Sequence, residues 1–238
     1  MKKSIDRFQG AVSGHFRQLI LAVAYLNIGA TVINRSPADA SVELSLGKDI
    51  KTEPFYLREL LLHSRSVEEG ILELHQNKMI AAWSDLLNDL FSSLVNLHFD
   101  GVRKFDELKK RTVRLDFASG TEMHEQIRAT LIADFAFQRY SDRVKITDDI
   151  LNPNSRHSTE LSTIKKHVFI RNAIQHHASR VYRDMLKELG CSRLAVLDGN
   201  ADERGLDVNE QIILTVPELD AIKRALFLVS NEWRKSCG

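Results

Sequence analysis

Most of the sequence shows the hydrophobic pattern of amphipathic helices, in which apolar residues recur every three or four positions. The clearest example lies between residues 55 and 100, a stretch without proline. Its second half holds an apolar stripe at this spacing: Trp83, Leu86, Leu87, Leu90, Leu94 and Leu97. Gly101 follows the stripe as a residue typical of helix ends. We interpret the stripe as the core-packing face of a helix rather than as a cofactor site.

The same pattern predicts helices along nearly the whole sequence. We expect them over residues 4–34, 55–100 with a break near Gly70, 103–112, 119–140, 159–189 and 215–233. Thr215, Pro217 and Glu218 form a strong start signal for the last helix. Short stretches with strand character predict strands over residues 42–46, 193–197 and 211–215.

These elements predict an all-α fold, namely a helical bundle with an N-terminal helical extension and a small β-hairpin before the last helix. A connector with glycine, proline and aspartate separates the first two helices. We therefore divide the protein into an N-terminal helix with its connector, residues 1–54, and a helical domain, residues 55–238.

Composition narrows the function classes. Hydrophobic residues make up 43% and charged residues 27% of the 238 residues, which is typical of a soluble globular protein. The net charge of +1 means that any nucleic-acid binding must depend on a local cluster of cations. Cys191 and Cys237 are too few for a disulfide framework or a thiolate metal site, which favours the reducing cytoplasm. The longest uncharged stretch, residues 18–34, falls short of the ~20 apolar residues of a membrane span, so we expect a packed helix and no membrane.

The predicted helix over residues 159–189 separates into two faces when projected at about 100° per residue. Its apolar face holds Ile170, Ile174, Ala178, Val181 and Met185. Its polar face holds Lys165, Asn172, His176, Arg183 and Lys187. Arg171 lies to one side of the polar face and can reach round to it with its long side chain. His176 is therefore expected in solvent, whereas His177 lies toward the apolar side.

An imidazole, a guanidinium and an amide so placed suit the cleavage of RNA without a metal ion. The ribose 2′-OH must lose a proton as it attacks phosphorus, and the 5′-oxygen must gain one. An imidazole can accept or donate a proton near neutral pH, so it can carry out either transfer. A guanidinium binds the phosphate and stabilises its growing charge. Asn172, one turn before His176, can orient the ring or the substrate.

Arg171, Asn172 and His176, with three residues between the last two, resemble the signature of the HEPN superfamily. The likeness covers residues 165–180 by residue type and residues 55–238 by helix order, and it leaves residues 1–54 unexplained. It is nearest to small prokaryotic HEPN ribonucleases of toxin or defence type. The resemblance implies a homodimer in which two signature helices build one composite, metal-independent endoribonuclease site. It implies Arg171 as phosphate clamp, Asn172 as orienting group and His176 as proton-transfer residue.

Further cations surround this stretch, so we expect RNA as the partner, with Lys165, Lys166, Arg180 and Arg183 as candidate RNA-binding residues. We expect no metal and no cofactor, because the scattered histidines define no metal site and the sequence has no glycine-rich phosphate loop. Arg58 and His63 show the same spacing within a leucine run, and we interpret that match as incidental.

Two other functions stay open. One is a non-catalytic HEPN module that binds a nucleotide or a partner protein, such as an antitoxin of nucleotidyltransferase type. The other is a helical scaffold whose polar stripe is only a solvated surface.

Overall fold

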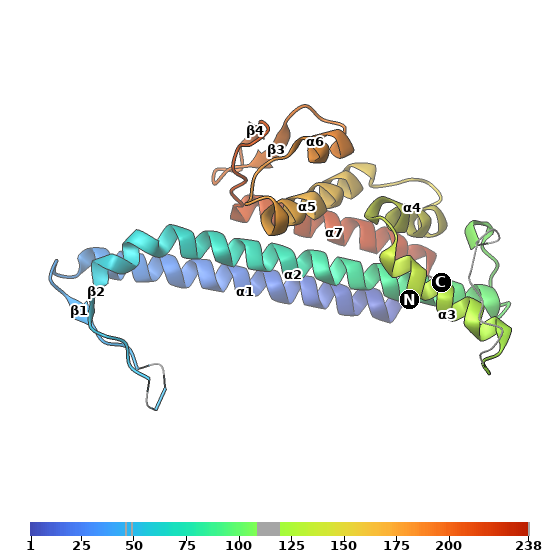
Figure 1. Ribbon diagram of the computed structural model, residues 1–238, viewed down its shortest axis with the longest axis horizontal. Coiled ribbons are helices and arrows are strands. Elements are labelled where there is room, and N and C mark those ends of the chain that lie inside the picture. Colours follow the sequence, from blue (N-terminus) through green and yellow to red (C-terminus); the bar gives the residue numbers. More distant parts are fainter. Residues whose placement is uncertain (46, 49, 109–119, 238) are drawn as a thin grey trace.

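The computed structural model describes residues 1–45, 47–48, 50–108 and 120–237. The described part of the protein is mainly helical, with two small antiparallel sheets (Figure 1). Its elements are α1 (Lys2–Arg35), β1 (Ser41–Val42), β2 (Phe55–Tyr56), α2 (Leu57–Phe99), the 3-10 helix η1 (Asp106–Leu108), α3 (Met123–Phe137), α4 (Tyr140–Leu151), α5 (Ser158–His176), α6 (Arg183–Leu189), β3 (Leu194–Leu197), β4 (Glu203–Leu206) and α7 (Val216–Ser236). The predicted all-α fold with a small hairpin before the last helix is confirmed.

A long antiparallel hairpin of α1 and α2 forms the length of the molecule (Figure 1). The short sheet of β1 and β2 closes its far end. The predicted break of α2 near Gly70 is wrong, since the helix runs without interruption from Leu57 to Phe99. A single glycine costs a helix only about 1 kcal/mol, which helix formers on both sides and the neighbouring α1 outweigh.

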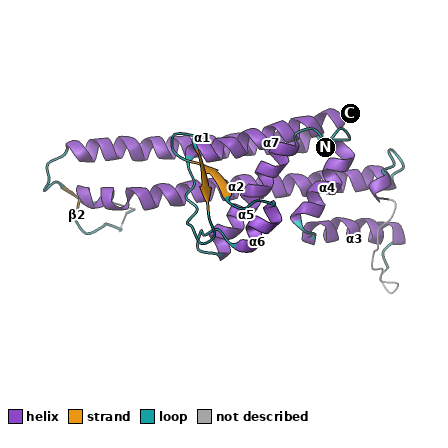
Figure 2. Cartoon of the chain, turned by 90° about the horizontal axis from the view of Figure 1, so that it is seen from above, coloured by secondary structure: helices purple, strands orange, loops and turns teal. Residues whose placement is uncertain are grey.

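The remaining helices pack on one half of this hairpin (Figures 1 and 2). The ring of Trp83 from α2 stacks on Trp233 from α7 with 4.9 Å between centroids, and Phe8 from α1 lies against it. The indole N–H groups are satisfied, because Trp83 donates to Tyr140 and Trp233 donates to Asp148. The predicted core stripe of α2 is confirmed over most of its length, since Leu97 is half-buried and the other members are buried: Trp83, Leu86, Leu87, Leu90 and Leu94.

The predicted helix over residues 159–189 is two helices, so its helical projection does not hold beyond His176. Between α5 and α6, Ala178 and Ser179 adopt left-handed backbone angles, with φ of 50° and 56°. The segment after the break pairs with residues 209–212 through Val181 N–H to Glu210 C=O and Ile212 N–H to Ser179 C=O. These hydrogen bonds replace helical ones, which explains why a helical pattern in the sequence does not continue as a helix.

The hairpin before α7 is present, but its second strand differs from the prediction. β3 pairs with β4, which begins at Glu203, whereas the predicted strand over residues 211–215 forms only an isolated bridge from Gln211 to Arg180. The capping signal of α7 is confirmed, because Thr215 Oγ1 accepts the N–H of Glu218.

Other predicted boundaries hold in part. The predicted helix over residues 119–140 is found as α3, and α4 follows it without having been predicted. Of the predicted helix over residues 103–112, only η1 is described, and residues 109–112 lie outside the described residues. The predicted strand over residues 42–46 is reduced to β1 and a bridge at Ser45, with Leu46 outside the described residues.

Helix α1 differs from the packed helix that the sequence predicted. The helix is long and apolar enough to cross a membrane, judged by length and composition alone. Only 6% of its most apolar 18-residue stretch is buried. Its first half contacts α7, where Gln9 donates to Ser230 and Asp6 pairs with Arg234, while its second half leaves large apolar side chains exposed. The cytoplasmic location and the division of the protein at residue 54 stay predictions.

Candidate functional site

The predicted signature lies in the last two turns of α5. This helix packs into the body through a buried stripe: Ile164, His167, Ile170 and Ala173. His176 is the last helical residue and is exposed, as the sequence predicted. Asn172 is half-buried one turn earlier on the same face of α5. Asn172 and His176 are therefore presented together at the end of one rigid helix.

A cavity of about 360 Å³ lies beside this face, between α5, the start of α4 and the end of α6, and both polar and apolar side chains line it. Asn172 and Lys165 line it from α5, and it is also lined by Tyr140, the first residue of α4, and by Arg139 just before that helix. Glu188 is the acidic residue that lines the cavity, and its backbone carbonyl oxygen accepts a hydrogen bond from Lys165 Nζ at 2.5 Å. The cavity thus combines two cations with one anion, next to the amide of Asn172.

Arg171 does not share the face of Asn172 and His176. It follows Ile164 by seven residues and His167 by four, which places it beside the buried stripe, about 140° around the helix from His176. Its side chain is half-buried, and its Nε is enclosed without a hydrogen-bond partner among the described residues. The structure therefore brings together Asn172 and His176 but not Arg171.

Several polar groups around the end of α5 have no side-chain partner within the described part of the protein. Neither Asn172 nor His176 makes a side-chain hydrogen bond there, and the guanidinium groups of Arg139 and Arg171 pair with no described carboxylate. By contrast, many cations elsewhere on the molecule are paired with acids. A set of uncommitted donors around one helix end is suited to binding an anionic ligand.

The four predicted RNA-binding cations differ in their surroundings. Lys165 lines the cavity, and Arg183 is exposed at the start of α6. Arg180 donates to the C=O of Asn209 and so helps to fix the turn after α5. Lys166 is held by Glu218 Oε1 at 2.5 Å and by the C=O of Ala195, which gives it a structural role.

Behind the site, a buried network of side chains connects α5 to the β3–β4 hairpin and to α7. Glu218 is fully buried, and its Oε2 accepts the N–H of Leu197. Its Oε1 lies 3.0 Å from Nε2 of His167, which is also fully buried. Burial alone would raise the pKa of Glu218, but the contacts with His167 and Lys166 outweigh it and hold the pKa at about 2. Burial lowers the pKa of His167, which Glu218 opposes, so the ring is neutral at neutral pH.

The turn that follows His176 is held in a strained conformation. Left-handed backbone is uncommon for residues other than glycine, and Ala178 and Ser179 adopt it in succession. Ser179 is fixed by its N–H bond to the C=O of Ala173 and by its side-chain bond to Glu73 of α2. Such strain concentrates at functional sites, so the turn adds weight to this end of α5 as a site.

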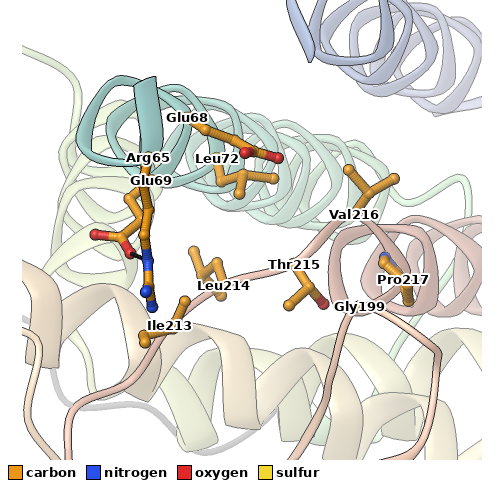
Figure 3. Close-up of a pocket in the computed structure, with 10 residues that line it drawn as sticks. All are labelled: Arg65, Glu68, Glu69, Leu72, Gly199, Ile213, Leu214, Thr215, Val216 and Pro217. Atoms are coloured by element: carbon orange, nitrogen blue, oxygen red, sulfur yellow. Dashed lines mark hydrogen bonds and ion pairs between the residues drawn. The ribbon is translucent and has the colours of Figure 1, made fainter. Parts of the chain in front are cut away.

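A second cavity, of about 300 Å³, lies between α2 and the segment that leads into α7 (Figure 3). Its α2 wall carries Arg65, Glu68 and Glu69, and Arg65 is paired with Glu69 at 3.0 Å. Figure 3 shows mainly aliphatic side chains, such as Ile213 and Leu214, on the facing wall. The charged groups of this cavity are largely engaged with each other, which makes it a weaker candidate than the cavity beside α5.

Sequence reasoning missed Arg139 and Tyr140, because they begin a helix that the pattern did not reveal. It also missed the network of His167, although Glu218 was recognised as part of a helix start. Among the described residues, no three His, Cys, Asp or Glu side chains gather so that they could hold a metal ion. Comparison with protein-family models, curated proteins and solved structures finds no match for this protein.

Proposed function

We propose that this protein is a metal-independent endoribonuclease whose site lies at the end of α5. The observation that carries the proposal is the exposed imidazole of His176 on the same helix face as Asn172, beside a cavity lined by Arg139 and Lys165. Asn172 lines the cavity, and His176 lies one helical turn beyond it. This arrangement offers a proton-transfer group and an amide at the end of the helix, and two cations farther along the same side for the other phosphates of a bound RNA strand.

In the proposed reaction, an imidazole takes the proton of a ribose 2′-OH, whose oxygen then attacks the adjacent phosphorus. The bond from phosphorus to the 5′-oxygen breaks, the leaving oxygen takes up a proton from solvent, and the imidazolium returns its proton to solvent. The products are a 2′,3′-cyclic phosphate and a 5′-hydroxyl, so no water is consumed in this step. Arg139 and Lys165 hold neighbouring phosphates of the RNA strand, and Asn172 orients the ribose or the ring of His176.

Arg171 acts across a dimer in this proposal. Because it lies about 140° around α5 from His176, it is poorly placed to serve the histidine of its own protomer. Two α5 helices that face each other would set Arg171 beside the partner subunit's His176. The site would then be composite, with a guanidinium from one copy and an imidazole from the other.

A cleavage assay with the purified full-length protein, EDTA and single-stranded RNA tests the function. We expect 2′,3′-cyclic phosphate ends from the wild type and their loss in His176→Ala, which removes an exposed side chain and leaves the circular dichroism spectrum unchanged. His63→Ala is the matched control, because Arg58 and His63 share the spacing but lie on the hairpin. Undiminished cleavage by His176→Ala would reject the assignment, and inactivity of the wild type on several RNAs would favour a binding module.

Mixing two inactive variants tests the composite site. If the site is shared, a heterodimer of the Arg171→Ala and His176→Ala variants contains one intact site, with Arg171 from one copy and His176 from the other. When the two variants pair at random, roughly a quarter of the wild-type activity therefore returns. If both residues act within one protomer, each site of the heterodimer lacks a group and activity stays absent. The second result would contradict the proposed role of Arg171 across the dimer.

A further inference from the structure

The half of the α1–α2 hairpin that the other helices leave uncovered is its outer half. This outer half has an apolar face that packs against no other described element. On α1 one stripe of positions, spaced alternately by three and four residues, runs along the solvent side of the helix. In the first half the stripe is small or polar: Ser4, Arg7, Ala11, Gly14 and Gln18. In the second half the same stripe is large and apolar: Leu21, Tyr25, Ile28 and Val32.

Helix α2 changes in the same way on the matching side of the hairpin. Near the body, Asp85 and Asp89 of α2 and Arg7 of α1 line a shared groove, where Arg7 pairs with Asp89. Leu74 precedes Asp85 by 11 residues, slightly more than three helical turns, and therefore lies on the same face of α2. Val67 and Leu60 continue this face at intervals of seven residues.

We name these side chains the hairpin seam: Leu21, Tyr25, Ile28, Val32, Leu60, Val67 and Leu74. Each is between 43% and 73% exposed. Seven such side chains offer on the order of 600 Å² per copy, which approaches the ~800 Å² per partner of a standard protein interface. A patch of this size on the surface of a soluble protein marks an interaction site.

We propose that the hairpin seam docks against the same seam of a second copy, so that two hairpins form an antiparallel four-helix bundle. The four seam residues of α1 have the same spacing when read in either direction along the helix, as an antiparallel pairing of two α1 helices requires. A two-fold axis between positions 26 and 27 sets Leu21 against Val32 of the partner subunit and Tyr25 against Ile28 of the partner subunit. The same axis sets Gln18 against Arg35 of the partner subunit, so both ends of the seam are polar.

The charges of the hairpin favour a second copy over a lipid bilayer. The uncharged stretch of α1 lies alongside a part of α2 that carries Arg58, Glu59, Arg65 and Glu69. Inserting the hairpin into hydrocarbon would strip water from these groups, which is very unfavourable. In a four-helix bundle they stay on the outer, solvated faces. The proposal rests on the hairpin alone and does not depend on the proposed nuclease activity. The seam lies on α1 and α2, so this contact is separate from the α5 contact of the proposed nuclease, and the two contacts together would build a tetramer.

Sedimentation equilibrium of the full-length protein tests the proposal. We expect association through the seam with a Kd on the order of 10 µM, because the seam is somewhat smaller than a standard interface. This step leads from monomer to dimer, or from dimer to tetramer where the α5 contact also forms. Ile28→Glu should weaken association at least ~10-fold, since it places a carboxylate in the apolar seam. Leu62→Glu is the matched control: Leu62 is 80% exposed and lies about 200° around α2 from Leu60. Self-association that is equally strong in Ile28→Glu and in the wild type, or a wild type that is monomeric at ~100 µM, would overturn the proposal.

Cross-linking tests the register without relying on a destabilising charge. In a Cys191→Ser background, which removes the exposed native thiol, the double variant Tyr25→Cys with Ile28→Cys should oxidise to a covalent dimer. Each single variant should cross-link far less, because the antiparallel register sets position 25 opposite 28. Equal cross-linking by single and double variants would reject this register. A different result would assign the seam to a membrane surface and overturn the proposal: the wild type floats with anionic vesicles, Ile28→Glu does not, and the two proteins have the same mass in sedimentation equilibrium.

Discussion

The Nε2 atom of His167 lies 3.0 Å from Oε1 of Glu218, and both side chains are completely buried. Together with Lys166, this contact joins α5, which carries the proposed site, to α7 and to β3. A buried carboxylate with these partners stabilises the fold only as long as the whole set is present, because each lone group would stay desolvated.

Glu218→Ala should therefore destabilise the protein strongly. The variant leaves Lys166 without its counter-charge and Leu197 N–H without its acceptor, so we expect a loss of about 3–5 kcal/mol in the free energy of unfolding. Urea denaturation followed by circular dichroism measures it. Glu203→Ala, at an exposed position of β4, is the control and should stay within about 0.5 kcal/mol of the wild type. A loss for Glu218→Ala as small as that of the control would contradict the structural role of the network.

The same network makes stability depend on pH. Burial lowers the pKa of His167 below 6.5, so below that pH the unfolded state binds a proton that the folded state excludes. The pKa of Glu218 is about 2 in the folded state against 4.5 for the free group, so a second proton favours the unfolded state below 4.5. Both stabilising contributions are complete above pH 6.5. Both are lost on acidification, His167 first and Glu218 later.

Unfolding in urea at about pH 7.5, 5.5 and 4 should show this stepwise loss. His167→Gln should flatten the change between the two higher pH values, since the variant no longer titrates there. His124→Gln, at an exposed position of α3, should keep the wild-type profile. A wild type equally stable at all three pH values would contradict the buried, neutral state of His167.

The cations of the cavity should contribute separately to RNA binding. Replacing Arg139 by alanine should weaken single-stranded RNA binding and lower the slope of log affinity against log salt by about 0.7, the value for one lost phosphate contact. Fluorescence anisotropy in an inactive His176→Ala background measures both quantities. Arg58→Ala removes an exposed cation on the hairpin and should leave the slope unchanged. Equal slopes for wild type and Arg139→Ala would place the RNA elsewhere.

The sequence predicted those elements whose cause is local. Thr215 and Glu218 start α7 through a cap that nearest neighbours define, and the Trp83 stripe is buried as its periodicity indicates. The exposure of His176 also followed from helix geometry. These features depend on residues within one or two helical turns.

The predictions that proved wrong concern features that depend on contacts between distant segments. The break after His176 is set by pairing with residues 209–212, which no local pattern reveals. β4 contains Glu203 and Arg204 and lacks the apolar alternation of a strand, and its pairing with β3 defines it. The placement of Arg139 beside Asn172 likewise requires α4 to fold back onto α5. The candidate site was therefore predictable on α5 but not across the cavity.

Two glycines give a final, opposed pair of predictions. Gly70 lies inside the uninterrupted α2, and a Cβ at that position would meet no atom, so Gly70→Ala should raise the free energy of unfolding by about 1 kcal/mol. Gly190 ends α6 with φ of 70°, also in open space, so Gly190→Ala should lower it by about 1 kcal/mol through backbone strain alone. Urea denaturation of both variants measures the two signs. Destabilisation by Gly70→Ala would indicate that α2 is bent or broken at that residue, whereas the continuous helix requires stabilisation, since alanine restricts the unfolded state and suits helical backbone angles.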